Sequence, residues 1–511
     1  MMATQYELND SSVVVVIGSG AGGGTVANEL AQKGIDVVCL EAGSRLTLAD
    51  VENHPANMDA KMGWHDKRIG SMLWICKTVG GTTMRWSAAT PRFEEHEFKT
   101  LSNYGQFDSG TTLIDWPLTL AELEPYYDKA ELKMGVSGTH GIPPSAETNN
   151  YKVLKAGAKR VGYKEYTTSH SAINPVARDG RPGCQQLAFC NSGCAIGAKW
   201  STLYTEVPAA EATGHFELRT EVMATRINHN KKGEITGVVY TDKKGDSHEQ
   251  KARAVCVAGN VVETTRLLLN SESTQFPNGL GNATGNVGKH YMRHMFGQAM
   301  AIMPKPVNYH RGTRISGSVS DERYHKTERG FAGGYIFETL AFDPLIVSTY
   351  AGGWGRDNTV FTENYTRVAG VFLTGEDPPE AANRITLHPT ERDANGLPVP
   401  VIEYRDHPNT LAMREHALER SRAIFESLGA TRFTGSDAPI GCHNMGVARM
   451  SENPDDGVTN RWGQAHDIPN LFVSDGSLFS TSAAANPTLT IVALAIRQAD
   501  HIAERMTQKT L

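Results

Sequence analysis

The sequence predicts an α/β protein with two domains, a Rossmann-like domain and a second domain of mixed-sheet α+β type. Three observations predict it. A strand at Val13–Ile17 runs through a glycine-rich turn, 18–24, into an alanine- and leucine-rich helix, as in a βαβ unit. At 511 residues the chain exceeds the size at which one hydrophobic core usually keeps growing. Stretches rich in aromatic residues, Gly and Pro, such as 136–150 and 294–374, show no βα rhythm and are assigned to the second domain.

The composition predicts a compact folded chain, because 40% of the residues are apolar and 21% are charged. Lysine and arginine total 50 against 56 acidic residues, and no basic block is visible, which argues against nucleic acid as a partner. The apolar run at Val13–Ile17 follows Glu7 and Asp10 rather than a basic segment, so we expect no signal peptide. No window approaches the roughly 20 apolar residues that span a bilayer, so membrane association is expected only through a partner.

The Rossmann-like domain is expected to draw on both ends of the chain and on its middle. The predicted elements after the first helix are a strand at Asp36–Leu40, a three-stranded meander within 222–258, a strand at Ala254–Val257, a helix at Glu263–Asn270, a strand at Asn470–Ser474 and a helix at Pro487–Met506. No internal repeat is visible, which argues against solenoids and propellers.

The glycine-rich turn has the pattern G-x-G-x-x-G at Gly18, Gly20 and Gly23, directly after a strand and at the start of a helix. The first glycine permits the tight turn, the second lets the backbone approach a pyrophosphate, and the third lets helix and strand pack closely. Glu41 ends the next strand, where a carboxylate can accept hydrogen bonds from an adenosine ribose. These residues predict a dinucleotide site but leave FAD and NAD both open, because both cofactors use this unit.

Three further segments, 78–91, 257–269 and 443–490, resemble the glucose–methanol–choline (GMC) oxidoreductase family, and the resemblance extends from end to end of the chain. Segment 78–91 resembles the family's flavin-contacting loop, and segment 257–269 is similar to the strand and helix after its adenine-contacting meander. The resemblance implies a GMC fold whose Rossmann-like domain binds FAD. The FAD-contacting residues that it implies are Gly80, Gly81, Thr82, Thr83, Val222, Ala258, Gly259, Asp475, Gly476, Pro487 and Thr488.

The resemblance also sets the expected division of the chain. The FAD-binding domain is expected to be discontinuous and to comprise 1–95, 200–295 and 440–511. The substrate domain is expected to comprise 96–199 and 296–439, and to include a cysteine-bearing loop at 181–199.

Segment 443–490 carries the predicted catalytic pair, His443 and Asn486, which stand 43 positions apart like the paired His/His or His/Asn of the family. Hydride leaves a carbinol carbon more easily when the hydroxyl proton is removed, and a histidine of near-neutral pKa is a natural acceptor. We therefore predict that His443 is the base. Asn486 can donate an N–H to the developing alkoxide while it stays neutral. A His/Asn pair is the pattern of several sugar-oxidising members.

Three of the seven cysteines, Cys184, Cys190 and Cys194, lie close together on a glycine-bearing loop. Three thiolates can converge on an iron–sulfur cluster, whereas a structural zinc usually has four ligands, so the trio predicts a [3Fe–4S] cluster. The spacing is similar to that in sugar-oxidising family members that carry such a cluster between flavin and a cytochrome; a further cysteine of those members is replaced by Gln185. Three buried reduced cysteines, or one disulfide, are the alternatives.

Family members that attach flavin covalently have a histidine at the position of Arg85, so the resemblance implies non-covalent FAD here. Arg85 can place positive charge near the flavin, and a structural ion pair is the alternative.

The resulting prediction is an FAD-dependent dehydrogenase that oxidises a hydroxyl of a sugar, glycoside or polyol by hydride transfer and passes electrons through the cluster to a cytochrome. The first alternative is a sugar oxidase that reduces O₂ without a cluster. The second is a non-catalytic flavoprotein that relays electrons, which would need no base at His443. The oxidised carbon, whether sugar C1, glycoside C3 or a polyol carbon, is left open.

Partners and location are also expectations. The absence of a signal peptide alone indicates the cytoplasm. Cluster-bearing relatives are exported beside a small subunit that carries the signal, so the resemblance implies a small chaperone or export subunit, a cytochrome c acceptor and the periplasmic face of the inner membrane.

Overall fold

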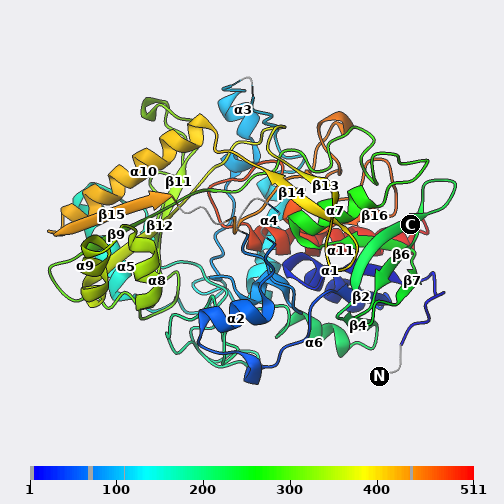
Figure 1. Cartoon of the computed structure of the whole chain (residues 1–511), viewed down its shortest axis with the longest axis horizontal. Helices are drawn as coiled ribbons and strands as arrows, with labels where there is room; N and C mark the ends of the chain where they lie inside the picture. The colour runs from blue at the N-terminus through cyan, green and yellow to red at the C-terminus, as the bar shows by residue number, and fades with distance from the viewer. Residues whose placement is uncertain (1–4, 67–68, 70–72, 109, 438–440) are drawn as a thin grey trace.

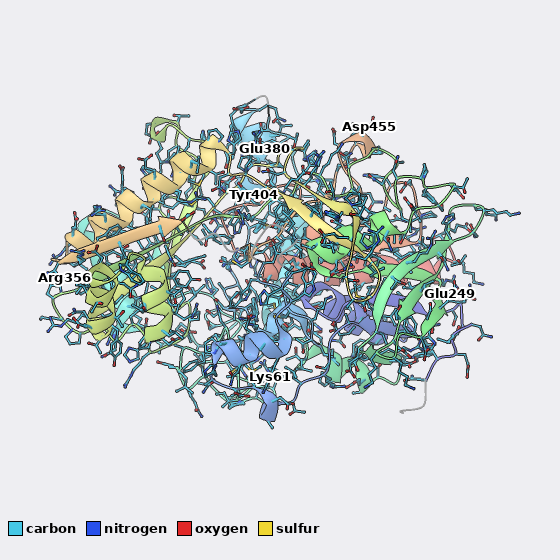
Figure 2. All side chains as sticks on the ribbon, viewed as in Figure 1. Lys61, Glu249, Arg356, Glu380, Tyr404 and Asp455 are labelled. Atoms are coloured by element: carbon cyan, nitrogen blue, oxygen red, sulfur yellow. The ribbon has the colours of Figure 1, made fainter. Side chains whose placement is uncertain are left out.

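The computed structural model describes residues 5–66, 69, 73–108, 110–437 and 441–511. Figure 1 shows a parallel sheet with its helices at one end of the molecule and an antiparallel sheet covered by α10 at the other. The predicted fold class is therefore confirmed. In Figure 2, the labelled side chains of Lys61 on α2, Glu249 on β7 and Arg356 on α9 lie at the periphery of the molecule.

The first sheet has five parallel strands in the order β16-β8-β1-β2-β4. Their bounds are β1 (Val14–Ile17), β2 (Val37–Glu41), β4 (Phe216–Thr220), β8 (Ala254–Val257) and β16 (Leu471–Val473). The central strands read as continuous apolar runs and are buried on both faces, as parallel strands covered by helices are. The helices of this end are α1 (Ala21–Ala31), α4 (Leu120–Met134), α6 (Glu206–Glu211), α7 (Asn260–Asn270) and α11 (Thr488–Thr507).

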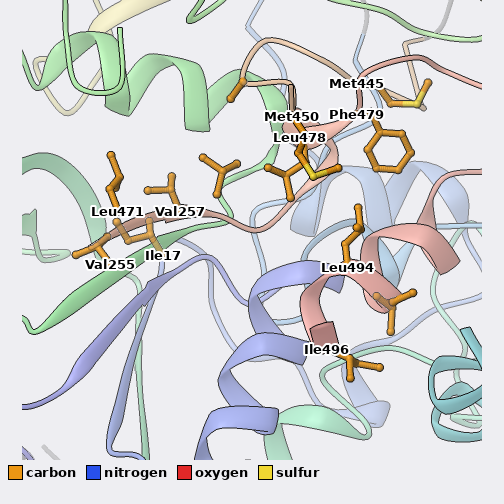
Figure 3. Packing of buried hydrophobic residues seen from close by; sticks show 14 of the residues in the cluster. Ile17, Val255, Val257, Met445, Met450, Leu471, Leu478, Phe479, Leu494 and Ile496 are labelled. Carbon is orange, nitrogen blue, oxygen red and sulfur yellow. The ribbon is translucent and has the colours of Figure 1, made fainter. Parts of the chain in front are cut away.

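Figure 3 shows how this sheet joins the rest of the core. Ile17, Val255, Val257 and Leu471 meet on one face of the sheet, and Leu494 and Ile496 approach from α11. The last helix of the chain therefore packs against the first, α1, and completes the domain from the C-terminal end, as the sequence predicts.

The predicted meander is present as three antiparallel strands, β5 (Met223–His229), β6 (Ile235–Thr241) and β7 (Ser247–Lys251). Its two turns contain Gly233 and Gly245 at φ +84° and +89°, a region that glycine enters without strain. The chain then passes through β8 into α7, which begins three residues earlier than predicted.

The second sheet has six strands in the order β15-β9-β12-β11-β10-β3. Their bounds are β3 (Tyr166–Thr167), β9 (Met295–Ile302), β10 (Ser318–Val319), β11 (Tyr335–Thr339), β12 (Val368–Gly375) and β15 (Arg432–Asp437). Every pairing in it is antiparallel, which corrects the expectation of a mixed sheet. The reason is connectivity: the segment 340–367 leaves β11 and returns at the same end, where Thr339 pairs with Val371, so no crossover is made.

The remaining elements cover the second sheet or connect the two ends of the molecule. They are α2 (Pro55–Met62), α3 (Thr100–Tyr104), α5 (Asn149–Arg160), α8 (Pro344–Ala351), α9 (Arg356–Glu363), α10 (Pro408–Glu426), β13 (Arg384–Arg392) and β14 (Pro398–Glu403). Helices α5 and α10 pack on β9 and β12 around a separate apolar core. No helix in the described part of the chain is both long and apolar enough to cross a membrane.

The predicted domain boundaries stay a prediction, and two elements assigned to the substrate domain pack against the parallel-sheet end of the molecule. One is α4, which contacts α11. The other is the hairpin β13–β14, which packs against α7. Arg266 of α7 makes this contact: its Nε donates to the Pro398 carbonyl at 2.7 Å, and it pairs with Asp393 at 2.8 Å. Residues 1–4 and the boundary at 440 lie outside the described residues.

Candidate functional site

A cavity of about 370 Å³ lies where both sheets and the C-terminal region meet. Most of the predicted site residues line it: Gly18, Gly20, Glu41, Gly81, Thr82, Thr83, Val222, Ala258, Gly259, His443, Asp475, Gly476, Asn486, Pro487 and Thr488. Gly23 and Gly80 do not line it, and of the three clustered cysteines Cys190 is flanked by two lining residues, Phe189 and Asn191. The structure thus brings residues from distant parts of the sequence to one cavity.

The glycine-rich turn is shaped by close backbone contacts. A Cβ at Gly18 would meet the Ala258 carbonyl oxygen at 2.4 Å, and one at Gly23 would meet the Gly18 carbonyl oxygen at 1.9 Å. These two glycines let the turn and α1 pack closely, as the sequence predicts. A Cβ at Gly20 would meet only the Cα of Gly81, at 3.9 Å, so the backbone at Gly20 is open to the cavity at the N-terminus of α1. A pyrophosphate can approach here.

Glu41 is buried at the end of β2, and its carboxylate is hydrogen-bonded to neighbouring residues of the chain. Its carboxylate accepts hydrogen bonds from the Ser19 N–H at 3.0 Å, the Ser19 hydroxyl at 2.7 Å and the Gly43 N–H at 2.8 Å. Burial raises its pKa, and these donors oppose the increase. Glu41 therefore holds the turn in shape and still lines the cavity, where a ribose hydroxyl can reach it.

The loop at 80–85 forms a 3-10 turn, Gly81–Met84, against the same glycine turn. The Gly80 N–H donates to the Ser19 hydroxyl at 3.0 Å, and the Thr83 hydroxyl donates to the Gly80 carbonyl at 2.5 Å. Arg85 follows, buried over the Trp74 ring and paired with Asp59. The structure shows the ion pair that was the alternative role for Arg85, and the side chain also lines the cavity.

Asp475 lies in the loop after β16 and also lines the cavity. Its carboxylate accepts from the Thr264 hydroxyl at 2.6 Å and the Ser477 N–H at 2.8 Å. Gly476 packs tightly, because a Cβ there would meet the Asn444 carbonyl oxygen at 2.6 Å. This loop is therefore fixed before any ligand binds.

His443 has a defined tautomer that follows from its neighbour His294. The His294 Nε2 lies 3.0 Å from the Ser482 carbonyl oxygen, which can only accept, so His294 carries its proton on Nε2. Its Nδ1, 2.8 Å from the His443 Nδ1, is then an acceptor when the ring is neutral. His443 must donate from Nδ1, which leaves Nε2 with a lone pair.

Both rings are neutral at pH 7. Burial lowers the pKa of His294 to about 4, and burial together with His294 lowers the pKa of His443 well below 6.5. This corrects the expectation of a near-neutral pKa at His443. No described residue bonds its Nε2, and the side chain lines the cavity, so a lone pair is available to an incoming hydroxyl.

Asn486 faces the same cavity and contacts a residue that the sequence did not single out. Its Nδ2 donates to the Glu338 carboxylate at 3.3 Å, which uses one of its two N–H bonds and leaves the other available. Its Oδ1 is buried and has no hydrogen-bond partner among the described residues. Glu338 lies on β11, lines the cavity and is 2% exposed.

FAD fits the residues of this cavity. The cavity extends along the glycine turn to the first residues of α1, and at Gly20 no side chain covers the backbone. The buried Glu41 carboxylate lies at the end of β2. An unpartnered buried amide oxygen at Asn486 is typical of a site that a ligand completes.

The cysteine loop borders the cavity. Cys184, Cys190 and Cys194 are all free thiols, so the structure makes no disulfide among them. Phe189 and Asn191, which flank Cys190, line the cavity wall. The three cysteine sulfur atoms are farther apart than the ligand atoms of a single metal ion. Within the described chain, the one group of side chains close enough to share an ion is Asp128, Glu131 and His140, and both of its acids form ion pairs with Arg92.

Three cations lie near the thiols of Cys190 and Cys194 without an ion pair to a carboxylate in the described chain. They are the buried Arg181 and Lys199 and the half-buried Arg314. The Lys199 Nζ donates to the carbonyls of Met84, Trp86 and Cys190 at 2.7–3.0 Å. Burial lowers its pKa to about 8, and the nearby thiols oppose the decrease. Buried cations usually have an anionic partner, so anionic charge at the thiols fits this environment.

Sequence reasoning missed His294, Glu338 and the three cations. Glu338 gave one signal, since a charged residue interrupts the apolar stretch Tyr335–Thr339. The others had none, because their roles depend on contacts between distant segments.

The chain is similar to known proteins over nearly its whole length. Family models described as GMC oxidoreductase match residues 35–296 and 379–495. The chain is 33% identical to 2-methyl-1,2-propanediol dehydrogenase from Mycolicibacterium austroafricanum, over 98% of this chain and 96% of that protein. It is 28% identical to the fructose dehydrogenase large subunit from Gluconobacter japonicus, over 98% of this chain and 99% of that protein.

A crystal structure of formate oxidase superposes with a TM-score of 0.70, covering 98% of this chain and 100% of that chain at 15% identity. At this identity the likeness concerns the fold alone.

Proposed function

The chain belongs to the GMC oxidoreductase family and is an FAD-dependent oxidoreductase of alcohol- or sugar-type substrates; from this premise we propose that it is a dehydrogenase that converts a hydroxyl of a sugar, glycoside or polyol to a carbonyl. The observation that carries the proposal is that His443, with its free Nε2, and Asn486 line one cavity that begins at the dinucleotide turn. A relay protein without catalysis would need neither group.

The residues divide the work of the reaction. When bound, FAD supplies the acceptor for the hydride. Nε2 of His443 takes the hydroxyl proton, and the free N–H of Asn486 stabilises the charge that develops on the oxygen. We propose that Gly18, Gly20, Gly23 and Glu41 hold the dinucleotide, which remains unlinked because Arg85 has no nucleophilic side chain.

The remaining predicted contacts complete the proposed site. The flavin side is formed by Gly80, Gly81, Thr82 and Thr83, and the adenosine side by Val222, Ala258 and Gly259. Asp475, Gly476, Pro487 and Thr488 close the site from the C-terminal region.

We also propose that Cys184, Cys190 and Cys194 hold a [3Fe–4S] cluster. The cations at Arg181, Lys199 and Arg314 support this, because three thiolates would supply the anionic charge that these side chains lack. Cluster ligands bind different iron atoms, so their sulfurs do not need the spacing of single-ion ligands. The name of one relative, the fructose dehydrogenase large subunit, supports a multi-subunit enzyme. The proposed partners are a small export subunit and a cytochrome c at the periplasmic face of the inner membrane.

Metal analysis of anaerobically purified protein tests the cluster. We expect about three iron and about four sulfide per chain, with the EPR signal of an oxidised [3Fe–4S] centre. Replacing any one of the three cysteines by Ser should abolish the signal and transfer to a cytochrome, while substrate still bleaches the flavin. Cys442→Ser, outside the loop, is the control and should keep the signal. If the protein is iron-free and the cysteine variants reduce the cytochrome at the parent rate, the cluster proposal is wrong. The cysteines would then be structural, and the oxidase without a cluster would be the remaining alternative.

A further inference from the structure

Glu338 stands between two cavities. A second cavity, of about 530 Å³, shares only Ala89 and Glu338 with the active-site cavity among the described residues. Its outer part is lined by the exposed residues His140 and Thr167, so it reaches the protein surface. Of the two shared residues, only Glu338 has a side chain that can bind and release a proton.

The carboxylate is held in a way that leaves one oxygen unused. Oε2 of Glu338 accepts two hydrogen bonds, from the Thr374 hydroxyl at 2.9 Å and from the Asn486 Nδ2 at 3.3 Å. Oε1 receives none from the described residues. A proton can therefore join and leave Oε1 without disturbing the position of Asn486.

The second cavity has the polarity that water requires. Hydroxyl groups of Thr167, Ser169, Ser318 and Ser320 line it, and Ser169 Oγ is buried without a hydrogen-bond partner in the described chain. A buried hydroxyl without a protein partner is normally satisfied by water. Water in this cavity would connect Glu338 with bulk solvent.

We propose that Glu338 is the proton exit of the active site and passes the substrate's proton into the second cavity. The inference rests on the proposed function, since only alcohol oxidation supplies this proton. The substrate O–H bond breaks as an N–H bond forms at Nε2 of His443, and the electron pair of the C–H bond leaves through the flavin to the acceptor. The proton then moves through cavity water to Oε1 of Glu338 and on to water in the second cavity. With a ferricyanide-type acceptor, one alcohol and two acceptors give one carbonyl, two reduced acceptors and two protons.

The electrostatic surroundings agree with this role. Burial raises the pKa of Glu338 to about 7, while the bonds from Thr374 and Asn486 lower it. Titratable and charged groups line both cavities that Glu338 joins. Cys442, His443 and Arg314 are among those of the active-site cavity, and Arg92, Glu94, Glu131, His140, His170 and Arg323 line the other. The acids among the latter pair with the two arginines. A carboxyl of this pKa both accepts and releases a proton near neutral pH.

The first experiment follows flavin bleaching and proton release together, with a pH-indicator dye, after anaerobic mixing of the FAD-loaded protein with a substrate polyol. In the parent the two signals should coincide. In Glu338→Gln, which keeps an acceptor for Thr374 and Asn486, proton release should lag behind bleaching by roughly tenfold or more. Proton release that keeps pace with bleaching in this variant would overturn the proposal. A parent that no alcohol bleaches would instead reject the proposed function.

The second experiment needs no substrate. Burial raises the pKa of Glu376 to about 8 and that of Asp377 to about 7, so these two acids also contribute carbonyl bands of protonated carboxyl groups. Subtracting the infrared spectrum of Glu338→Gln from that of the parent isolates the carbonyl band of protonated Glu338. After mixing with D₂O this band should shift more slowly when the second cavity is blocked by Ser320→Trp or Thr167→Trp. Ser247→Trp, at the exposed first residue of β7, is the matched control. Equal exchange rates in all four proteins would show that the second cavity is not the route.

Discussion

At the scale of single residues, the reactivity of His443 depends on the histidine beside it. Burial keeps the ring neutral, and the acceptor at Nδ1 of His294 holds the proton of His443 away from the cavity. His294 does not face the cavity, so it is a positioning residue. Its own orientation depends on the Ser482 carbonyl.

The rate of flavin reduction should therefore have an unusual pH profile. Because the pKa of His443 lies well below 6.5, the base stays neutral as the pH falls through 6.5, and the rate should stay level there. It should fall only as the pH approaches about 4, where His294 takes a proton on Nδ1 and reverses the hydrogen bond. Stopped-flow flavin reduction across this range is the measurement. A midpoint near 6.5 would show that the base is an ordinary histidine.

A pair of variants separates tautomer control from packing in the same experiment. His294→Asn keeps an acceptor oxygen near the position of Nδ1 and should stay within a few-fold of the parent. His294→Leu leaves the Nδ1–H of His443 without a partner, which costs ~1–3 kcal/mol, or about 5- to 150-fold in rate. Equal rates in the two variants would contradict tautomer control by His294.

At this scale the sequence predicted which side chains form the site but not the contacts that determine their pKa values. His443 and Asn486 could be named from their motif, whereas their pKa values and partners could not. His294 precedes β9 and Glu338 lies within β11, so their contacts with His443 and Asn486 depend on the tertiary packing of the second sheet.

At the scale of elements, the first turn of α1 joins packing and binding in one motif. A Cβ at Gly22 would lie 1.5 Å from the Ser474 carbonyl oxygen, so this helix can approach the loop after β16 only with glycine there. Gly20, two residues earlier, faces open space instead. Gly22 is therefore required for the packing of α1, whereas Gly20 leaves space in the cavity for a ligand.

Two alanine substitutions should separate these roles. Gly22→Ala should destabilise the flavin-free protein by about 1–3 kcal/mol, because the backbone of the neighbouring loop must move. Gly20→Ala should leave that stability within about 0.5 kcal/mol but lower FAD affinity at least roughly tenfold, since its methyl group enters the cavity. Denaturant unfolding of the apoprotein and flavin titration measure the two effects. Equal loss of stability in both variants would refute the distinction.

Elements with strong local patterns were predictable, and others were not. The first βαβ unit, the meander and the last helix have apolar periodicity and glycine turns that mark them. The two-residue strands β3 and β10 form only because β11 provides an edge, and the antiparallel order of the second sheet depends on how a long connection returns. Neither feature has a local signature.

At the scale of the whole molecule, the proposed site takes residues from both sheets. The dinucleotide turn belongs to the parallel sheet, Glu338 belongs to the antiparallel sheet, and His443 and Asn486 lie in the C-terminal region between them. Glu338 lines both the second cavity and the cavity of His443 and Asn486, which gives substrate and proton separate routes in the proposed reaction.

Anaerobic mixing of the FAD-loaded protein with a panel of sugars, glycosides and polyols, followed at the flavin absorbance, tests the proposed alcohol oxidation most directly. We expect bleaching by at least one compound, with a carbonyl formed in amounts equal to the flavin reduced. In His443→Ala the same bleaching should be slower by roughly 10²–10⁴-fold at unchanged flavin content. Bleaching at the parent rate in that variant, or no bleaching by any alcohol in the parent, would contradict the proposed reaction.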